Sequence, residues 1–248
     1  GNEIAIRYND ALSSLQGLDN LSSVGNDIFI IDNDALTSLQ GLSSLSSLVG
    51  DLQIEENDAL TSLNGPNMLT SIGGNLRIRR NDALTSLDGL NNISSVGGYF
   101  SLVFNDALTS LNGLGNLSSV ASFIIIGTNP ALTSLNGLES LSSVGTDISI
   151  VLNESLTSIT SLNNLSSLGG RLEIRGNNAL TSIAGLSSLT SLDRLLIADN
   201  EALTSLQGLN NIASTASDLR IENNDALTSI QALNNLSSVG GELRITDN

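Results

Sequence analysis

Apolar residues recur along the chain in units of 24 residues, and two local patterns alternate within each unit. Ile28 and Ile30 flank Phe29 with a period of two, which is the pattern of a strand with one buried face. From Leu36 to Leu48, a leucine stands at every third position. A period of three fits neither an α-helix nor a strand, so we expect 3₁₀-like turns that each point one leucine inward. Each unit is therefore predicted to form one coil, with one strand and a turn-rich opposite side.

One asparagine per unit marks the phase of the repeat. It stands at Asn9, Asn33, Asn57, Asn81, Asn105, Asn129, Asn153, Asn177, Asn200, Asn224 and Asn248. Every interval is 24 residues except the one from Asn177 to Asn200, which is 23, and the missing residue falls within 192–195. We expect these asparagines to form a buried ladder at the strand exits, with side-chain amides bonded to the backbone of their own and adjacent coils.

The repeat predicts one architecture for the whole chain. If each coil donates a strand, the strands form one parallel sheet of about eleven, roughly 50 Å long, in a β-rich solenoid. Glycine pairs such as Gly73-Gly74 and Gly97-Gly98 precede the strands, where we expect positive φ. Residues 1–248 are expected to form a single solenoid of ten coils. Both ends match internal coils, so we also expect an uncapped excerpt of a longer chain.

The repeat unit resembles a known family. The pattern Leu-x-Ile-x-x-Asn followed by Ala-Leu-Thr-Ser-Leu, seen over 52–63 and nearly repeated over 219–230, is similar to leucine-rich repeats. The longer repeat pattern, which includes Ser-Val-Gly-Gly before the strand, is closer to the receptor L-domain variety of these repeats. This resemblance implies a right-handed, β-helix-like coil of the kind found in bacterial and fungal surface proteins. It specifies architecture far better than function.

Composition narrows the function. The formal net charge is −16, so anionic nucleic acid is a poor partner. No apolar stretch is long enough to predict membrane insertion. His and Cys are absent, which removes the commonest general base, thiol nucleophiles and zinc ligands. We therefore expect no enzyme, no cofactor and no metal site.

The strand segments vary from coil to coil, whereas the Ala-Leu-Thr-Ser-Leu segment barely changes. All arginines and all aromatic residues lie in or beside strands. An apolar centre bordered by arginine is how protein interfaces are built. The candidate partner-binding residues are Phe29, Arg77, Arg79, Tyr99, Val103, Phe104, Phe123, Ile125, Val151, Arg171 and Arg175. The alternatives are a face that another part permanently covers, or strands that merely tolerate substitution.

Three other columns carry weaker signals. Asp10, Asp34, Asp58, Asp82 and Asp106 follow the ladder; turn capping is the favoured interpretation, and weak Ca²⁺ binding is the minor one. A threonine column from Thr37 to Thr228 is expected to pair with backbone, with ice binding the minor alternative. Asn-x-Ser sequons stand at Asn20, Asn92, Asn116, Asn153, Asn164 and Asn235.

These observations predict a non-catalytic, extracellular or cell-surface module for recognition or adhesion. Its partner is expected to be a protein or a glycan, bound through the variable strand face. The alternative is a structural repeat of an extracellular filament or wall protein, in which copies of the chain pack on one another. Ice-binding and calcium-binding solenoids are less favoured.

Overall fold

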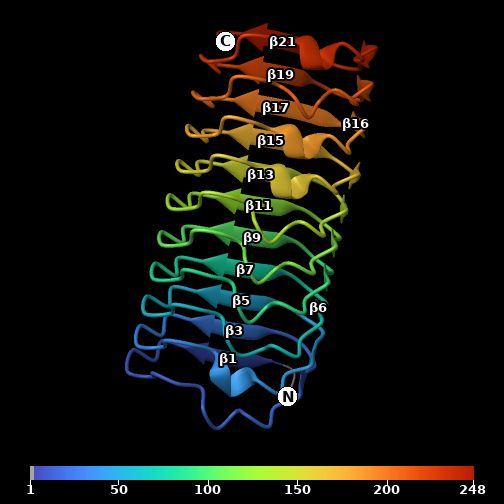
Figure 1. The fold of residues 1–248 in the computed structure, drawn as a ribbon. Coiled ribbons are helices and arrows are strands. Elements are labelled where there is room, and N and C mark those ends of the chain that lie inside the picture. Colours follow the sequence, from blue (N-terminus) through green and yellow to red (C-terminus); the bar gives the residue numbers. More distant parts are fainter. Residues whose placement is uncertain (1–2) are drawn as a thin grey trace.

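The computed structural model describes residues 3–248 and shows a parallel β-solenoid of about ten coils. Its main sheet has eleven strands in sequence order. They are β1 (Ile4–Arg7), β3 (Ile28–Ile31), β5 (Leu52–Glu55), β7 (Leu76–Arg79), β9 (Phe100–Val103), β11 (Ile124–Gly127), β13 (Ile148–Val151), β15 (Arg171–Arg175), β17 (Arg194–Ala198), β19 (Leu219–Glu222) and β21 (Leu243–Thr246). They run in the same direction, stacked one above the next from the N-terminal to the C-terminal end (Figure 1). The predicted fold class is confirmed.

Strand register follows the repeat, so equivalent residues of successive coils lie side by side. Ile28 pairs with Leu52, for example, and Phe29 pairs with Gln53. Inward positions such as Ile28 and Ile30 are fully buried, and outward positions such as Phe29 are half-buried. The leucines spaced by three also point inward; Leu36, for example, is completely buried. The core is therefore a stack of nearly identical aliphatic layers.

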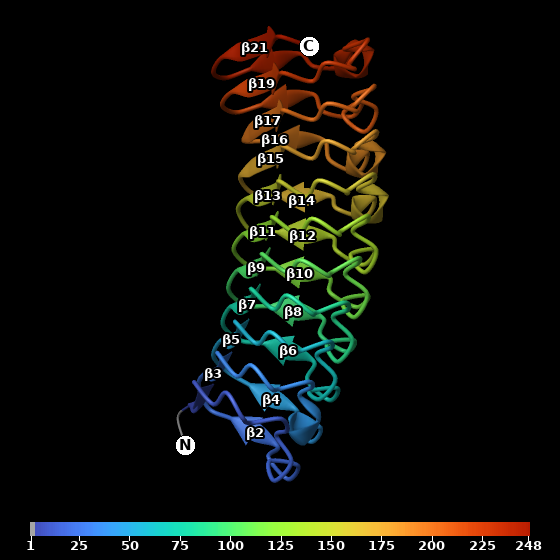
Figure 2. The same cartoon turned by 90° about the vertical axis from the view of Figure 1, so that its left-hand side faces the viewer.

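A second set of strands, each only two residues long, runs along another side of the stack. These strands were not predicted from the sequence. Seven of them form one sheet: β2 (Ser23–Val24), β4 (Ser47–Leu48), β6 (Ser71–Ile72), β8 (Ser95–Val96), β10 (Ser119–Val120), β12 (Ser143–Val144) and β14 (Ser167–Leu168). Figure 2 shows this ladder beside the main sheet. Its Ser-Val and Ser-Leu segments alternate exposed and buried residues, which is the strand pattern at its shortest length.

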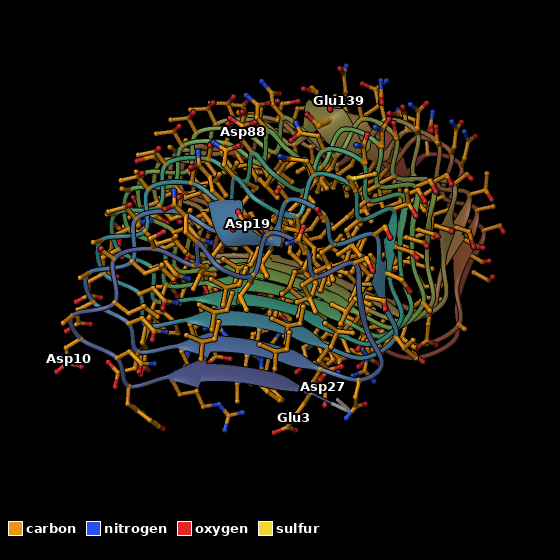
Figure 3. All side chains as sticks on the ribbon, turned by 90° about the horizontal axis from the view of Figure 1, so that it is seen from below. Glu3, Asp10, Asp19, Asp27, Asp88 and Glu139 are labelled. Atoms are coloured by element: carbon orange, nitrogen blue, oxygen red, sulfur yellow. The ribbon has the colours of Figure 1, made fainter. Side chains whose placement is uncertain are left out.

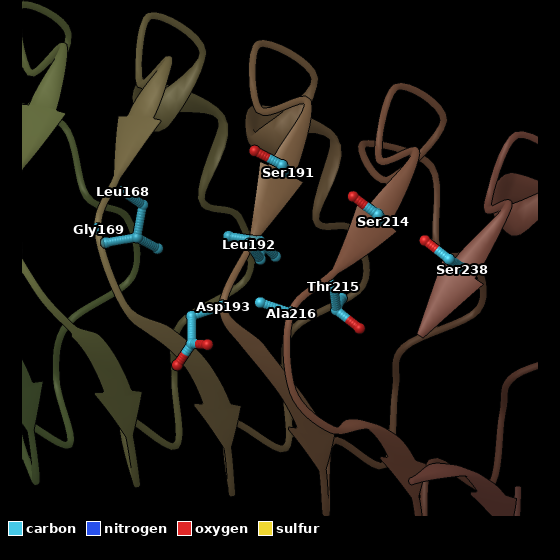
Figure 4. Close-up of a pocket in the computed structure, with 9 residues that line it drawn as sticks. All are labelled: Leu168, Gly169, Ser191, Leu192, Asp193, Ser214, Thr215, Ala216 and Ser238. Carbon is cyan, nitrogen blue, oxygen red and sulfur yellow. The ribbon is translucent and has the colours of Figure 1, made fainter. Parts of the chain in front are cut away.

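The 23-residue coil interrupts this second ladder. The strands β16 (Ser191–Leu192), β18 (Ser214–Thr215) and β20 (Ser238–Val239) form a separate three-stranded sheet, whereas β15 and β17 pair without a break. The missing residue is therefore absorbed away from the main sheet. A shallow depression of about 570 Å³ opens at the interruption, between Leu168 and Ser238 (Figure 4).

The remaining side of each coil consists of turns and short 3₁₀ helices, as the period of three predicted. The 3₁₀ helices are η1 (Gln40–Leu42), η2 (Thr160–Leu162), η3 (Ala184–Leu186) and η4 (Gln231–Leu233). Other coils make the same corner with a glycine at positive φ, such as Gly113 at 109°. The expectation of positive φ at the glycine pairs is wrong. Gly97 has an ordinary φ and lies against the preceding coil, where an added Cβ would stand 2.2 Å from the carbonyl oxygen of Gly73.

The asparagine column joins every coil to the next. The nine asparagines from Asn33 to Asn224 are completely buried. The Nδ2 of Asn105 donates to the carbonyl oxygens of Val103 in its own coil, 3.1 Å, and Ile78 in the preceding coil, 3.2 Å. Its backbone N donates to Oδ1 of Asn129, 3.1 Å. The ladder thus satisfies backbone groups that the turn after each strand would leave unpaired.

Candidate interaction surface

The outward side chains of the main sheet form three parallel rows, which together we call the strand face. The upstream row contains Glu3, Asp27, Asp51, Asn75, Tyr99, Phe123, Asp147, Arg171, Arg194, Asp218 and Glu242. The middle row contains Ala5, Phe29, Gln53, Arg77, Ser101, Ile125, Ser149, Glu173, Leu196, Arg220 and Arg244. The downstream row contains Arg7, Ile31, Glu55, Arg79, Val103, Gly127, Val151, Arg175, Ala198, Glu222 and Thr246.

The centre of the strand face, over β9 and β11, is apolar and ordered. The rings of Tyr99 and Phe123 stack with centroids 4.8 Å apart and an interplanar angle of 6°. Ile125 lies half-buried in the next row. Gly127 forms a low point of the downstream row, where an added Cβ would stand 2.9 Å from a methyl carbon of Val151. Five of the candidate residues therefore lie together: Tyr99, Val103, Phe123, Ile125 and Val151.

The arginines beside this centre are held in place by neighbours. Arg77 donates to the hydroxyl of Tyr99 and lies 3.4 Å from a carboxylate oxygen of Glu55. On the other side, Arg171 pairs with Glu173 and Arg175 pairs with Asp199, each at 2.8 Å. These ion pairs are partly exposed, so they contribute little to stability. They instead fix the positions of guanidinium groups around an apolar patch.

Two candidate residues lie away from the centre. Phe29 stands on β3, where the guanidinium of Arg7 covers its ring at 4.3 Å from the centroid. Phe104 follows β9 rather than lying on it, and its side chain is 40% exposed at the corner of the coil. Arg79 and Arg80 approach its ring at 5.6 and 5.7 Å from the centroid.

Charge is distributed unevenly around the solenoid. The strand face carries eight of the nine arginines and nine of the 25 carboxylates, so its formal charge is only −1 of the net −16. The remaining −15 lies on the other sides, which hold a single arginine, Arg80. Seen along the stack, Asp10 projects at a corner, and Asp88 and Glu139 project from the side opposite the main sheet (Figure 3). The strand face is therefore nearly neutral, as is the side formed by the two-residue strands, whereas twelve of the 16 other carboxylates lie at the strand exits.

The aspartate column lines an acidic depression of about 580 Å³ beside the strand exits, together with Asp32, Glu56, Arg80 and Phe104. Partial burial, followed by repulsion from Asp106 and Asp58, raises the pKa of Asp82. Within residues 3–248, no group of three or more acidic side chains is arranged to hold a metal ion. In the part of the chain that the structure describes, no aspartate of this column accepts a hydrogen bond that would cap its turn, and the turn is closed by backbone, with Leu84 N donating to Asn81 O at 3.0 Å.

The threonine column pairs with the backbone of the preceding coil. Thr85 Oγ1 donates to Thr61 O at 3.2 Å, and Thr133 Oγ1 donates to Thr109 O at the same distance. The sequon asparagines of the exposed turns behave similarly, since Asn116 Nδ2 donates to Asn91 O at 2.7 Å. Asn153 belongs to the buried ladder. These columns therefore connect coils.

Two features of the strand edges were not predicted. Residues that directly precede ladder asparagines have left-handed backbone, including Asp32 (φ 57°), Phe104 (φ 59°) and Leu152 (φ 57°). Residue type gives no signal for this, because the column mixes charged, aromatic and aliphatic side chains. In the upstream row, short polar side chains bond to the backbone of the next coil; Asp27 Oδ1, for example, accepts from Asp51 N at 2.8 Å. These bonds to the next coil could have been predicted from the Asp or Asn that recurs before successive strands.

Comparison with protein-family models and with curated proteins finds no match for the chain. No helix among residues 3–248 is both long and apolar enough to cross a membrane.

Proposed function

We propose that this protein is a non-catalytic recognition module that binds a protein or a glycan through its strand face. One observation carries the proposal: the variable positions, eight of the nine arginines and three of the six aromatic residues share a single nearly neutral face of an otherwise uniform solenoid. Interfaces favour Tyr, Phe and Arg around an apolar centre, and the stacked rings of Tyr99 and Phe123 supply a rigid one.

The finer assignment, a leucine-rich repeat of the receptor L-domain variety, is part of the same proposal. Its support is the Leu-x-Ile-x-x-Asn motif, whose apolar residues line the core and whose asparagine forms the ladder. Proteins of that variety work at cell surfaces, so we place this protein outside the cell or on its surface. The non-catalytic role rests on a sequence without His and Cys.

The test compares two triple variants on arrays of glycans and extracellular proteins. Replacing Tyr99, Phe123 and Ile125 with serine should weaken every interaction of the wild-type protein by about tenfold or more, because buried aromatic anchors dominate interface energies. The matched control replaces Val49, Met68 and Ile230, which are exposed apolar residues away from the strand face, with serine. It should bind like the wild type. Equal binding by both variants would refute a role for the strand face.

A further inference from the structure

The charges on the strand face follow an order along the stack, and this order bears on the identity of the partner of the proposed recognition face. Summed over its three outward positions, the coil of β3 carries −1, that of β5 −2 and that of β7 +2. The coils of β9 and β11 carry none. Those of β13, β15 and β17 carry −1, +1 and +1. The signs thus reverse across the uncharged centre.

A two-fold axis that is parallel to the strands and passes between β9 and β11 pairs coils of opposite charge. It brings a second copy face to face with the first, reverses the order of its coils and leaves its strand direction unchanged. The coil of β7 then meets that of β13, β5 meets β15, and β3 meets β17. Each meeting joins opposite charges, and each row of the strand face meets the same row of the other copy.

The match extends to single residues. Asp51 faces Arg171, Glu55 faces Arg175 and Asp27 faces Arg194 of the other copy. Every pair occurs twice because the axis is two-fold.

Apolar residues also meet. Phe29 faces Leu196, and Val103 faces the low point at Gly127 in the centre of the interface. One pair joins like charges instead of opposite ones: Glu3 faces Asp218 at the end of the overlap.

Neighbouring arrangements put like charges together. Moving the axis onto β11 places β7 opposite β15, both positive, and moving it onto β9 places β5 opposite β13, both negative. A two-fold axis along the solenoid would set Arg77 against its own copy and Arg171 against Arg175. Like charges directly opposed in an interface cost several kcal/mol, so the charge pattern selects one register.

The contact is also large enough. Ten overlapping strands at a spacing of about 4.8 Å, each about four residues long, cover about 640 Å² of each copy. A specific interface of standard size buries about 800 Å² per partner. The strand face carries only −1, so the surfaces in contact oppose little net charge, and the acidic columns at the strand exits of the two copies lie along one edge, outside the contact.

We infer that the partner of the strand face is a second copy of this chain, bound about this two-fold axis. The inference rests on the proposed function, because it assigns a partner to the same face.

Sedimentation equilibrium of the full chain tests the charge pairs. The wild type should form dimers. Glu55→Arg alone and Arg175→Glu alone should each raise the dimer Kd by about tenfold or more, and the double variant should return to within about threefold of the wild type. Residues 55 and 175 lie about 24 Å apart within one chain, so recovery must come from contacts between copies. Thermal melting of each variant verifies folding.

Cross-linking fixes the register independently, since the chain contains no cysteine. With a bis-maleimide of about 8 Å, Ser101→Cys should form covalent dimers, because facing sheets lie about 10 Å apart and the two copies of Ser101 flank the axis. Phe29→Cys alone and Leu196→Cys alone should not. An equimolar mixture of the two should form heterodimers, although residues 29 and 196 are about 34 Å apart in one chain.

A monomeric wild type up to millimolar concentration would overturn the inference, as would cross-linking of Phe29→Cys to itself. Such a result would leave the proposed function standing if the serine triple variant at Tyr99, Phe123 and Ile125 still lost binding on the arrays. Equal array binding by both triple variants would instead count against the proposed function.

Discussion

At the scale of single residues, the ladder asparagine is the most constrained position in the fold. Its place could be predicted, because a polar residue that recurs at a strand exit among aliphatic residues needs buried partners. The left-handed residue before it could not. Such backbone costs about 1 kcal/mol for most side chains, yet Phe104 and Leu152 adopt it. The hydrogen bonds of the ladder overcome that local preference.

Replacing Asn105 with leucine should lower the free energy of unfolding by about 1–3 kcal/mol, because buried backbone groups lose their partners. These groups are the carbonyls of Ile78 and Val103 and the N–H of Asn81. Urea denaturation measures the loss. The control is Asn112→Leu, an exposed asparagine of the next turn without a side-chain hydrogen bond in the described chain, which should change stability by less than about 0.5 kcal/mol. A loss equal to that of the control would mean that the ladder is dispensable.

At the scale of elements, spacing determined what could be predicted. Periods of two and three located the main strands and the turn-rich side, because each spacing points its apolar residues inward in only one kind of backbone. The two-residue strands were missed, since Ser-Val is too short to show a period. The turn that holds Gly113, and its equivalent in other coils, has two backbone shapes. It is a 3₁₀ turn at Gly41, Ser161, Gly185 and Ala232, and a positive-φ turn at Gly113.

Gly113→Ala should therefore lower stability by about 1 kcal/mol or more, because alanine is strained at φ 109° and its Cβ would stand 2.2 Å from the carbonyl oxygen of Leu87, so the corner must change toward its 3₁₀ shape. The matched control is Gly115→Ala in the same turn. Its added Cβ would meet no atom within 4 Å, and its φ is not positive. It should leave stability unchanged or raise it by about 0.5 kcal/mol. Denaturation midpoints that fall equally in both variants would contradict the two-shape description.

At the scale of the whole molecule, the strand face could be located from the sequence because variation and arginine gather in one segment of each coil. The candidate residues there remain a prediction. What could not be predicted is how their charges are already engaged, for example Arg175 with Asp199. Such pairs join coils 24 residues apart and depend on side-chain conformations that no spacing specifies. The acidic columns on the other sides follow directly from the repeat.

These columns make stability depend on pH. Because the pKa of Asp82 is raised in the folded state, its charge opposes folding at neutral pH, and this cost disappears as the pH falls through that pKa. Asp82→Asn should stabilise the protein at pH 7 by at most about 0.5 kcal/mol, since solvent screens the exposed group. The gain should vanish near pH 3 and shrink in about 1 M salt, where the Debye length is about 3 Å.

Asp199 gives the opposite control. The hydrogen bond that Asp199 accepts from Asn223, followed by that from Arg175, lowers the pKa of its carboxyl group. Its negative charge therefore stabilises the folded state at pH values above the ordinary pKa of an aspartate. Asp199→Asn should therefore lose stability at pH 7 and converge with the wild type in acid. Thermal melting of both variants between pH 3 and pH 7 compares the two signs, and stabilisation of both at pH 7 would be inconsistent with these pKa directions.

The unequal charge of the sides gives the molecule a permanent electric asymmetry. The centre of its negative charge lies toward the corner at the strand exits, where the columns that contain Asp32 and Asp34 hold twelve of the 16 carboxylates outside the strand face. Near any positively charged support, such as an anion-exchange matrix or a polycation coat, the resulting torque turns these columns toward the support. A single copy would then adsorb by its strand-exit edge, which leaves the strand face at an angle to the support and open to a second copy.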